Sequence, residues 1–193
     1  MSSQPRRCQH HALVLGVGNV LFQDEGLGVR ALERLHARYL VPATVHTLEG
    51  GVLGLDLLPY LGHDTPLLIM DAVQTGAPPG RIVRLEGEAI SRALGLRLSL
   101  HQVGLEELLA VARLQGTLPA QVVLWGVEPS RLGWGTDLSP AVSNALDALV
   151  DHVAAELRAW GHDLAPGAPE GEEACRRANT WGPLPPPCAE EAR

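Results

Sequence analysis

Two acidic residues and one histidine stand at places in the sequence where their side chains can do chemistry together. Glu25 follows the glycine-rich stretch 16–18, Asp71 closes the apolar run 67–70, and His101 stands at the expected start of a helix. A carboxylate that closes a buried strand is costly unless it caps, pairs or binds something. Two carboxylates and an imidazole form an O,O,N donor set with open positions, which suits a borderline divalent ion such as Ni²⁺ or Zn²⁺. We therefore expect these three residues to form one metal-contacting site.

Each of these residues also has a simpler explanation. Asp24 and Glu25 stand at the start of an expected helix, where carboxylates cap free N–H groups and interact favourably with the positive end of the helix dipole. Asp71 can accept a hydrogen bond from a loop amide, and His101 can be an ordinary surface or packing residue. His101 nevertheless belongs to a capping-box pattern that begins at Ser99. A position in the first turn favours the neutral imidazole, which is the form that binds metals.

The glycines after the first apolar run invite comparison with a dinucleotide-binding fingerprint. Gly16 and Gly18 match the first two glycines of that pattern, but Leu21 occupies the place of the third. Asp24 and Glu25 stand where a pyrophosphate would need positive potential at a helix N-terminus. The sequence thus disfavours a nucleotide-binding α/β domain, and we keep this function as an alternative.

The spacing of apolar residues predicts an α/β three-layer sandwich. Strands are expected at residues 12–17, 43–48, 67–70, 81–85 and 122–127. Helices are expected at about 24–39 and 52–61, from residue 99 onward, and at 139–160. Right-handed crossovers place helices on both faces of a mostly parallel five-stranded sheet. The link 74–80 is too short for a crossover helix, so the expected strand order is 2-1-3-5-4 with strand 4 antiparallel.

This strand order explains how three distant residues can meet. The first and third strands are neighbours at the topological switch point, above which ligands bind at the carboxyl ends of the strands. Glu25 follows the first strand and Asp71 ends the third. Residues 86–98 can span up to about 40 Å, which is enough to bring His101 back to the same end of the sheet.

Composition limits the class of protein and its partners. The chain has 193 residues and a net charge of −7, which argues against nucleic acid and anionic membranes as partners. All fifteen basic residues are arginine, which excludes catalytic lysines. The three cysteines lie outside the periodic region, as expected for a cytoplasmic protein. We expect a flexible N-terminus (1–11), a single α/β domain (12–161), a disordered tail rich in proline and glutamate (162–193), and a monomer.

Four motifs in this order resemble the [NiFe]-hydrogenase maturation endopeptidases, over about residues 12–160. The matching residues are Gly16-Val17-Gly18-Asn19-x-x-x-x-Asp24-Glu25-Gly26-x-Gly28-Val29, Gly50-Gly51, Asp71-Ala72, and His101-Gln102-x-Gly104-Leu105. The resemblance implies a protease domain that removes a C-terminal extension from the large-subunit precursor after nickel insertion. It also implies that Glu25, Asp71 and His101 contact a nickel ion presented by the precursor. Zinc or cadmium could occupy the same contacts in vitro.

The catalytic groups are less sharply defined. The core offers no serine elbow, cysteine nucleophile or zinc-protease helix, which leaves attack by water with a carboxylate as base. We expect Asp24, Glu25 and Asp71 to be the catalytic acids, with Asp24 or Glu49 as the base. Many members of the family carry aspartate where Glu49 stands. The residues alone do not separate a protease from a non-catalytic chaperone that holds the nickel-bearing precursor.

Overall fold

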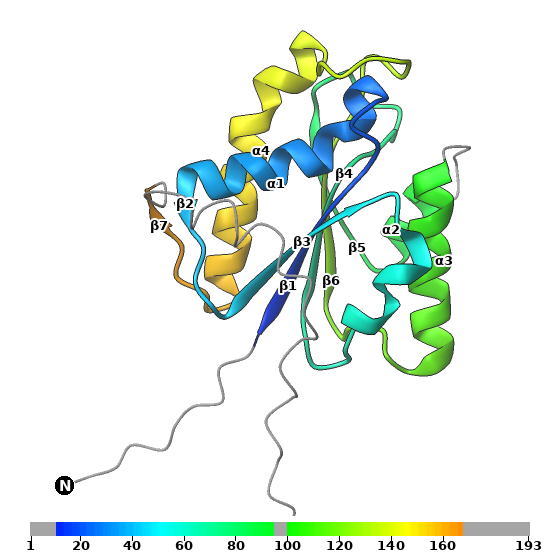
Figure 1. The fold of residues 1–193 in the computed structure, drawn as a ribbon, viewed down its shortest axis with the longest axis vertical. Coiled ribbons are helices and arrows are strands. Elements are labelled where there is room, and N and C mark those ends of the chain that lie inside the picture. The colour runs from blue at the N-terminus through cyan, green and yellow to red at the C-terminus, as the bar shows by residue number, and fades with distance from the viewer. Residues whose placement is uncertain (1–10, 95–99, 168–193) are drawn as a thin grey trace, which may run out of the picture.

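A five-stranded sheet forms the centre of the computed structural model, which describes residues 11–94 and 100–167, with side chains for all of these except 100–103. The strand order is β3-β1-β4-β6-β5 (Figure 1). The strands are β1 Ala12–Val17, β3 Val45–Gly51, β4 Leu67–Ala72, β5 Ile82–Glu86 and β6 Val122–Val127. All neighbours are parallel except β5 and β6, which are antiparallel. The predicted order and the antiparallel edge strand are confirmed.

Helices cover both faces of this sheet (Figure 1). One layer is formed by α1 Leu27–Arg38 and α4 Pro140–Ala159, which pack against each other and against the sheet. The other layer is formed by α2 Glu88–Leu94, α3 Leu100–Gln115 and the 3₁₀ helix Gly54–Tyr60. Because β6 follows α3 and lies parallel to β4, α3 begins at the end of the sheet where β1, β3 and β4 end.

Alternation along the buried strands divides the core into two parts. In β1, Ala12 and Val14 contact the layer of α1 and α4, whereas Leu13 and Leu15 contact the layer of α2 and α3. In β4, Leu67 and Ile69 likewise face the α2 and α3 layer. Asp71 shares this alternation, so its side chain lies on the face of the sheet that α3 covers.

Two predicted boundaries near the first strands are wrong. The expected helix at 24–39 is a 3₁₀ helix at Gln23–Gly26 followed by α1, and Tyr39 belongs to the short strand β2 Tyr39–Leu40. Residues 49–51, which lie beyond the expected end of the second strand at residue 48, extend β3, because the N–H of Gly18 donates to the carbonyl of Gly51 at 2.9 Å. This bond continues the pairing of β3 with the first chain segment beyond a β-bulge at the end of β1.

The folded domain continues beyond its predicted end at residue 161. The short strand β7 Ala165–Pro166 pairs antiparallel with β2, and His162 and Leu164 are buried. His162 Nδ1 also lies 3.0 Å from the Thr44 hydroxyl. Residues 162–167 therefore belong to the domain, not to a tail. Residues 1–10 and 168–193 lie outside the described residues, so the flexible N-terminus and the rest of the disordered tail stay predictions.

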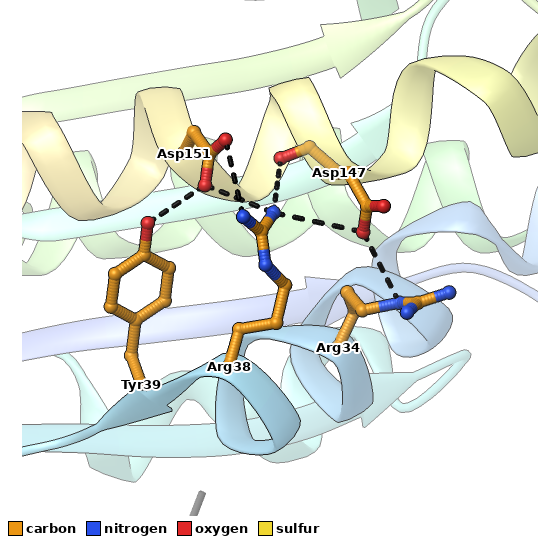
Figure 2. A network of polar contacts seen from close by, with 5 residues as sticks. All are labelled: Arg34, Arg38, Tyr39, Asp147 and Asp151. Atoms are coloured by element: carbon orange, nitrogen blue, oxygen red, sulfur yellow. Dashed lines mark hydrogen bonds and ion pairs between the residues drawn. The ribbon is translucent and has the colours of Figure 1, made fainter. Parts of the chain in front are cut away.

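A polar network joins α1 to α4 on the surface (Figure 2). Arg38 donates to the Asp147 carbonyl at 3.0 Å and pairs with the Asp151 carboxylate at 2.9 Å. The Tyr39 hydroxyl donates to Asp151 at 2.7 Å. Arg34 also pairs with the Asp147 carboxylate, at 3.5 Å. These contacts hold the two helices of one layer together beside their apolar interface.

Replacing Tyr39 by phenylalanine is expected to lower the free energy of unfolding by about 1.5 kcal/mol, because one hydrogen bond to a charged acceptor is lost. That hydrogen bond and burial raise the pKa of Tyr39 above its usual value of about 10. A raised pKa in the folded state means that the contribution is complete below pH 10 and is lost as pH rises through the folded-state pKa. Urea denaturation of both proteins between pH 7 and 11 measures it. A difference that does not shrink above pH 10 contradicts this account.

Candidate active site

Two of the predicted acids lie at the carboxyl ends of neighbouring strands. Asp71 is completely buried near the end of β4, and its Oδ1 accepts the N–H of Ala72 at 2.7 Å. Glu25 is 7% exposed and lies in the 3₁₀ helix that follows β1. This 3₁₀ helix contacts β4 directly, and β1 pairs with β4. The fold thus brings the segments of Glu25 and Asp71 together at the switch point, as the strand order predicts.

Two glycines allow the 3₁₀ helix and α1 to lie this close to the strands. Gly18 has a φ of +126°, and a Cβ at this position would overlap the carbonyl oxygen of Glu25. A Cβ on Gly28 would overlap the carbonyl oxygen of Met70. Gly18, which matches part of a nucleotide-binding fingerprint, therefore has a packing role in this fold. Together the two glycines let the backbone that carries Glu25 approach β4.

The backbone of His101 lies at the same end of the sheet. His101 is the second residue of α3, whose first turn begins where the strands end. Three residues later, Gly104 packs against Gly54, which follows the end of β3, and a Cβ on Gly104 would lie 3.0 Å from the Gly54 Cα. The His101 side chain and the predicted N-cap Ser99 lie outside the part of the structure that is described, so the role of His101 stays a prediction.

Asp24 is fully buried and binds one loop with both carboxylate oxygens. Oδ2 accepts the N–H groups of Ser130 and Arg131, both at 2.8 Å, and the Ser139 hydroxyl at 2.8 Å. Oδ1 accepts the Ser139 N–H at 2.6 Å. Ser139 is the N-cap residue of α4, but its hydroxyl donates to Asp24 and makes no cap hydrogen bond. The catalytic role of Asp24 stays a prediction, and these four hydrogen bonds favour a positioning role over proton transfer.

Glu49 lies within β3, one residue beyond the expected end of that strand. It is half-buried and pairs in register with Gly16 of β1. Alternation groups it with Val45 and Thr47, on the face covered by α1, where His36 contacts the Thr47 hydroxyl at 2.9 Å. Burial lowers the pKa of His36. Because Asp71 lies on the opposite face of the sheet, Glu49 is not adjacent to it along the sheet surface, and its role as base stays a prediction.

Sequence reasoning missed Glu128, a buried acid that follows β6. Its Oε2 accepts the Thr75 N–H at 2.6 Å, the Thr75 hydroxyl at 2.9 Å and the Ala77 N–H at 3.3 Å. Glu128 thereby fixes the loop that leaves β4 just after Asp71. The sequence could have marked Glu128 as a candidate, because it follows an apolar strand just as Asp71 ends one.

Among the residues with described side chains, neither a complete set of metal ligands nor the cavity between α2 and α3 marks the candidate site. Within residues 11–94 and 104–167, whose side chains are described, no three His, Cys, Asp or Glu residues could hold a metal ion together. A cavity of about 600 Å³ lies between α2 and α3, lined by residues such as Ile90, Leu109 and Arg113. It also includes Val122 at the amino end of β6, so it lies at the opposite end of the sheet from Asp71 and is not part of the candidate site.

Residues 29–156, more than half of the chain, match the model of a family described as hydrogenase maturation protease. The chain belongs to this family. This hydrogenase maturation protease is 41% identical over 158 residues to the hydrogenase expression/formation protein HupD of Rhodobacter capsulatus, covering 81% of this chain and 75% of HupD. It is 36% identical over 155 residues to the hydrogenase 2 maturation protease of Escherichia coli, covering 80% of this chain and 94% of the other.

A solved structure supports the same assignment. The hydrogenase maturating endopeptidase HybD from E. coli superposes with a TM-score of 0.77 at 36% identity, covering 81% of this chain and 97% of HybD. The resemblance expected from the four motifs and the α/β fold are both confirmed, and the protein is a protease. In the described residues, 11–94 and 100–167, no helix is both long and apolar enough to cross a membrane.

Proposed function

We propose that this hydrogenase maturation protease removes the C-terminal extension of a [NiFe]-hydrogenase large-subunit precursor after nickel insertion, with the nickel as its recognition element. The observation that carries the proposal is the pair of buried acids at the switch point. Glu25 and Asp71 lie on contacting segments at the carboxyl ends of β1 and β4, and α3 begins at the same end with His101 in its first turn. Their oxygen and nitrogen donors suit Ni²⁺.

In this proposal the nickel belongs to the substrate. Glu25, Asp71 and His101 contact the ion that the precursor presents, and this contact orients the adjoining peptide above the strand ends. A precursor without nickel lacks these contacts, so its extension is not held for cleavage. Two carboxylates also discriminate against a substrate without the cation, because their negative charges would then face the peptide without compensation.

Cleavage is proposed to use water and a carboxylate base. Cys8, Cys175 and Cys188 all lie outside the residues that the structure describes, and no cysteine occurs in the sequence between 12 and 161. Of the predicted acids, Asp24 is occupied by loop donors and Glu49 faces the α1 layer. We therefore assign proton transfer to Glu25 or Asp71, the other two predicted catalytic acids.

The partner and the compartment are part of the same proposal. The precursor is the protein partner, and the enzyme acts on it as a monomer in the cytoplasm, without nucleic acid or membrane. The net charge of −7 disfavours nucleic acid and anionic membranes. A core sequence without cysteine fits a reducing compartment.

Intact mass of a co-expressed large subunit tests proteolysis against the chaperone alternative. We expect the precursor to lose a C-terminal peptide only when this chain is present. A stable complex with a precursor of unchanged mass would contradict proteolysis and support a chaperone that uses the same acids as a docking site. A matched control without this chain shows whether the host itself trims the precursor.

A further inference from the structure

Exposed apolar side chains are carried by two segments beside the candidate site. Trp134 is 82% exposed, and Leu132 in the same loop is 44% exposed. Leu21, which precedes the 3₁₀ helix of Glu25, is 55% exposed. The ring of Phe22 packs edge-on against Trp134, with ring centroids 5.6 Å apart. We define these four residues as the rim of the site.

Backbone hydrogen bonds join the two segments of the rim. The N–H of Gln23 donates to the Gly135 carbonyl at 2.8 Å, and the N–H of Gly135 donates to the Leu21 carbonyl at 3.0 Å. The loop 128–139 therefore runs beside the segment that enters the 3₁₀ helix, at the end of the sheet where the strands end (Figure 1). Leu21 and Trp134 are therefore carried by two segments that lie side by side, and Phe22 links these segments through its ring contact with Trp134.

Asp24 holds the loop 128–139 in this position through hydrogen bonds. Its carboxylate accepts four hydrogen bonds from Ser130, Arg131 and Ser139, which bracket the tip of the loop on both sides. A buried carboxylate is tolerated only when it is well hydrogen-bonded, and here all of these partners belong to the loop. It also lies at the N-terminus of α4, where the helix dipole favours a negative group.

This arrangement needs an explanation beyond the stability of the fold. A free loop can reduce the exposure of a tryptophan by folding over it, but this loop is held at both ends with Trp134 pointing into solvent. Single exposed apolar residues are ordinary, whereas a cluster with a fixed aromatic residue is typical of interaction surfaces. Tryptophan is also enriched among the residues that dominate binding energies at protein interfaces.

We propose that Asp24 is a positioning residue that holds the loop 128–139 in place, and that the rim, with Trp134 at its centre, contacts an apolar surface of the precursor. This inference rests on the proposed function. The occupant follows from continuity with the site: Asp24 and Glu25 are adjacent, so a protein engaged at Glu25 covers the rim that Asp24 supports. A small ligand at Glu25 would leave Trp134 exposed, whereas a folded precursor would bury it.

The direct test is Trp134→Ala, assayed for binding and for cleavage of the purified precursor. We expect the Kd for the precursor and the KM to rise at least about 10-fold, while kcat stays close to that of wild type, because the contact is made equally before and during the reaction. Leu114→Ala is the matched control. Leu114 is an 86% exposed leucine near the end of α3, far from the site, and its replacement should change neither quantity.

Asp24→Asn separates positioning from proton transfer. If Asp24 acts through the loop, KM rises while kcat is largely kept. The double variant Asp24→Asn with Trp134→Ala should then have about the same KM as whichever single variant binds the precursor more weakly. A fall in kcat by about two orders of magnitude with unchanged KM would overturn the positioning role and restore Asp24 as a base. If Asp24→Asn does not fold, Ser139→Ala removes only the hydroxyl donor and should shift KM in the same direction.

The outcomes distinguish this inference from the proposed function. If wild type does not cleave the precursor, proteolysis of this substrate fails, and the binding assay still tests the rim. If wild type cleaves and Trp134→Ala binds and cleaves as wild type does, the rim is not a docking surface and the inference is overturned.

Discussion

Replacing Asp71 by asparagine is expected to slow cleavage of a nickel-loaded precursor at least about 100-fold while the protein stays folded. Asparagine has nearly the same shape, and its amide oxygen can still accept the Ala72 N–H that Oδ1 accepts at 2.7 Å. The change removes one negative charge at a fully buried position. A 100-fold effect corresponds to about 2.7 kcal/mol of lost transition-state stabilisation, a usual scale for losing one charged contact in a site that excludes water.

Single-turnover cleavage, followed by intact mass, measures this effect without interference from product release. Asp163→Asn is the control, because it makes the same chemical change at an exposed position after α4. We expect the control to cleave at the wild-type rate, and thermal unfolding should show both variants folded. Wild-type cleavage by a folded Asp71→Asn protein would remove Asp71 from the site and with it the proposed nickel contact.

The second large effect concerns the packing that supports the site. Gly28→Ala is expected to destabilise the protein by about 4 kcal/mol or more, or to prevent folding. The added Cβ would overlap the carbonyl oxygens of Met70 and Val17. Both are backbone atoms of strands within the sheet, so neither can rotate away as a side chain could. Relief requires α1 to move off the sheet, and the 3₁₀ helix with Glu25 would move with it.

Urea denaturation, together with the yield of folded protein, measures this destabilisation. Gly62→Ala is the matched control, because its Cβ would meet only the Thr65 hydroxyl, at 3.7 Å. We expect the control to change the free energy of unfolding by no more than about 1 kcal/mol, in either direction. Equal stability of the two variants would mean that α1 does not approach β1 and β4 as closely as the structure has it.

The fold was largely predictable from local signals. The apolar runs at 12–17 and 122–127 coincide with β1 and β6, because central strands buried on both faces must be apolar at every position. The short link 74–80 correctly predicted the antiparallel edge strand β5. The spacing of apolar residues likewise predicted the helix at 139–160, which the structure shows as α4 Pro140–Ala159.

The errors share one physical cause, which is that long-range contacts override local propensity. Glycines at 50 and 51 indicate a turn locally, but pairing with the segment around Gly18 keeps them in β3. Residues 162–167 have a loop-like composition, yet β7 pairs with β2, which lies far earlier in the chain. Such pairings leave no periodic signal in either segment.

The same reason limited the prediction of the site. The hydrogen-bond partners of Asp24 could not be predicted from the sequence, because they lie 106 to 115 positions away in the loop 128–139. Glu49 looked like a turn carboxylate, and only the register of β3 assigns it to the α1 face. By contrast, the position of Asp71 was predictable, because strand order alone fixes which strand ends meet.

Nickel dependence of cleavage tests the central claim most directly. One preparation of precursor is divided into three parts: nickel-loaded, nickel removed by a chelator, and nickel removed and then restored. Each is incubated with this protease, and the intact mass of the large subunit is followed over time. We predict loss of the C-terminal peptide from the loaded and restored samples and no loss from the nickel-free sample. Equal cleavage of all three would contradict the account, because Glu25, Asp71 and His101 would then recognise something other than nickel.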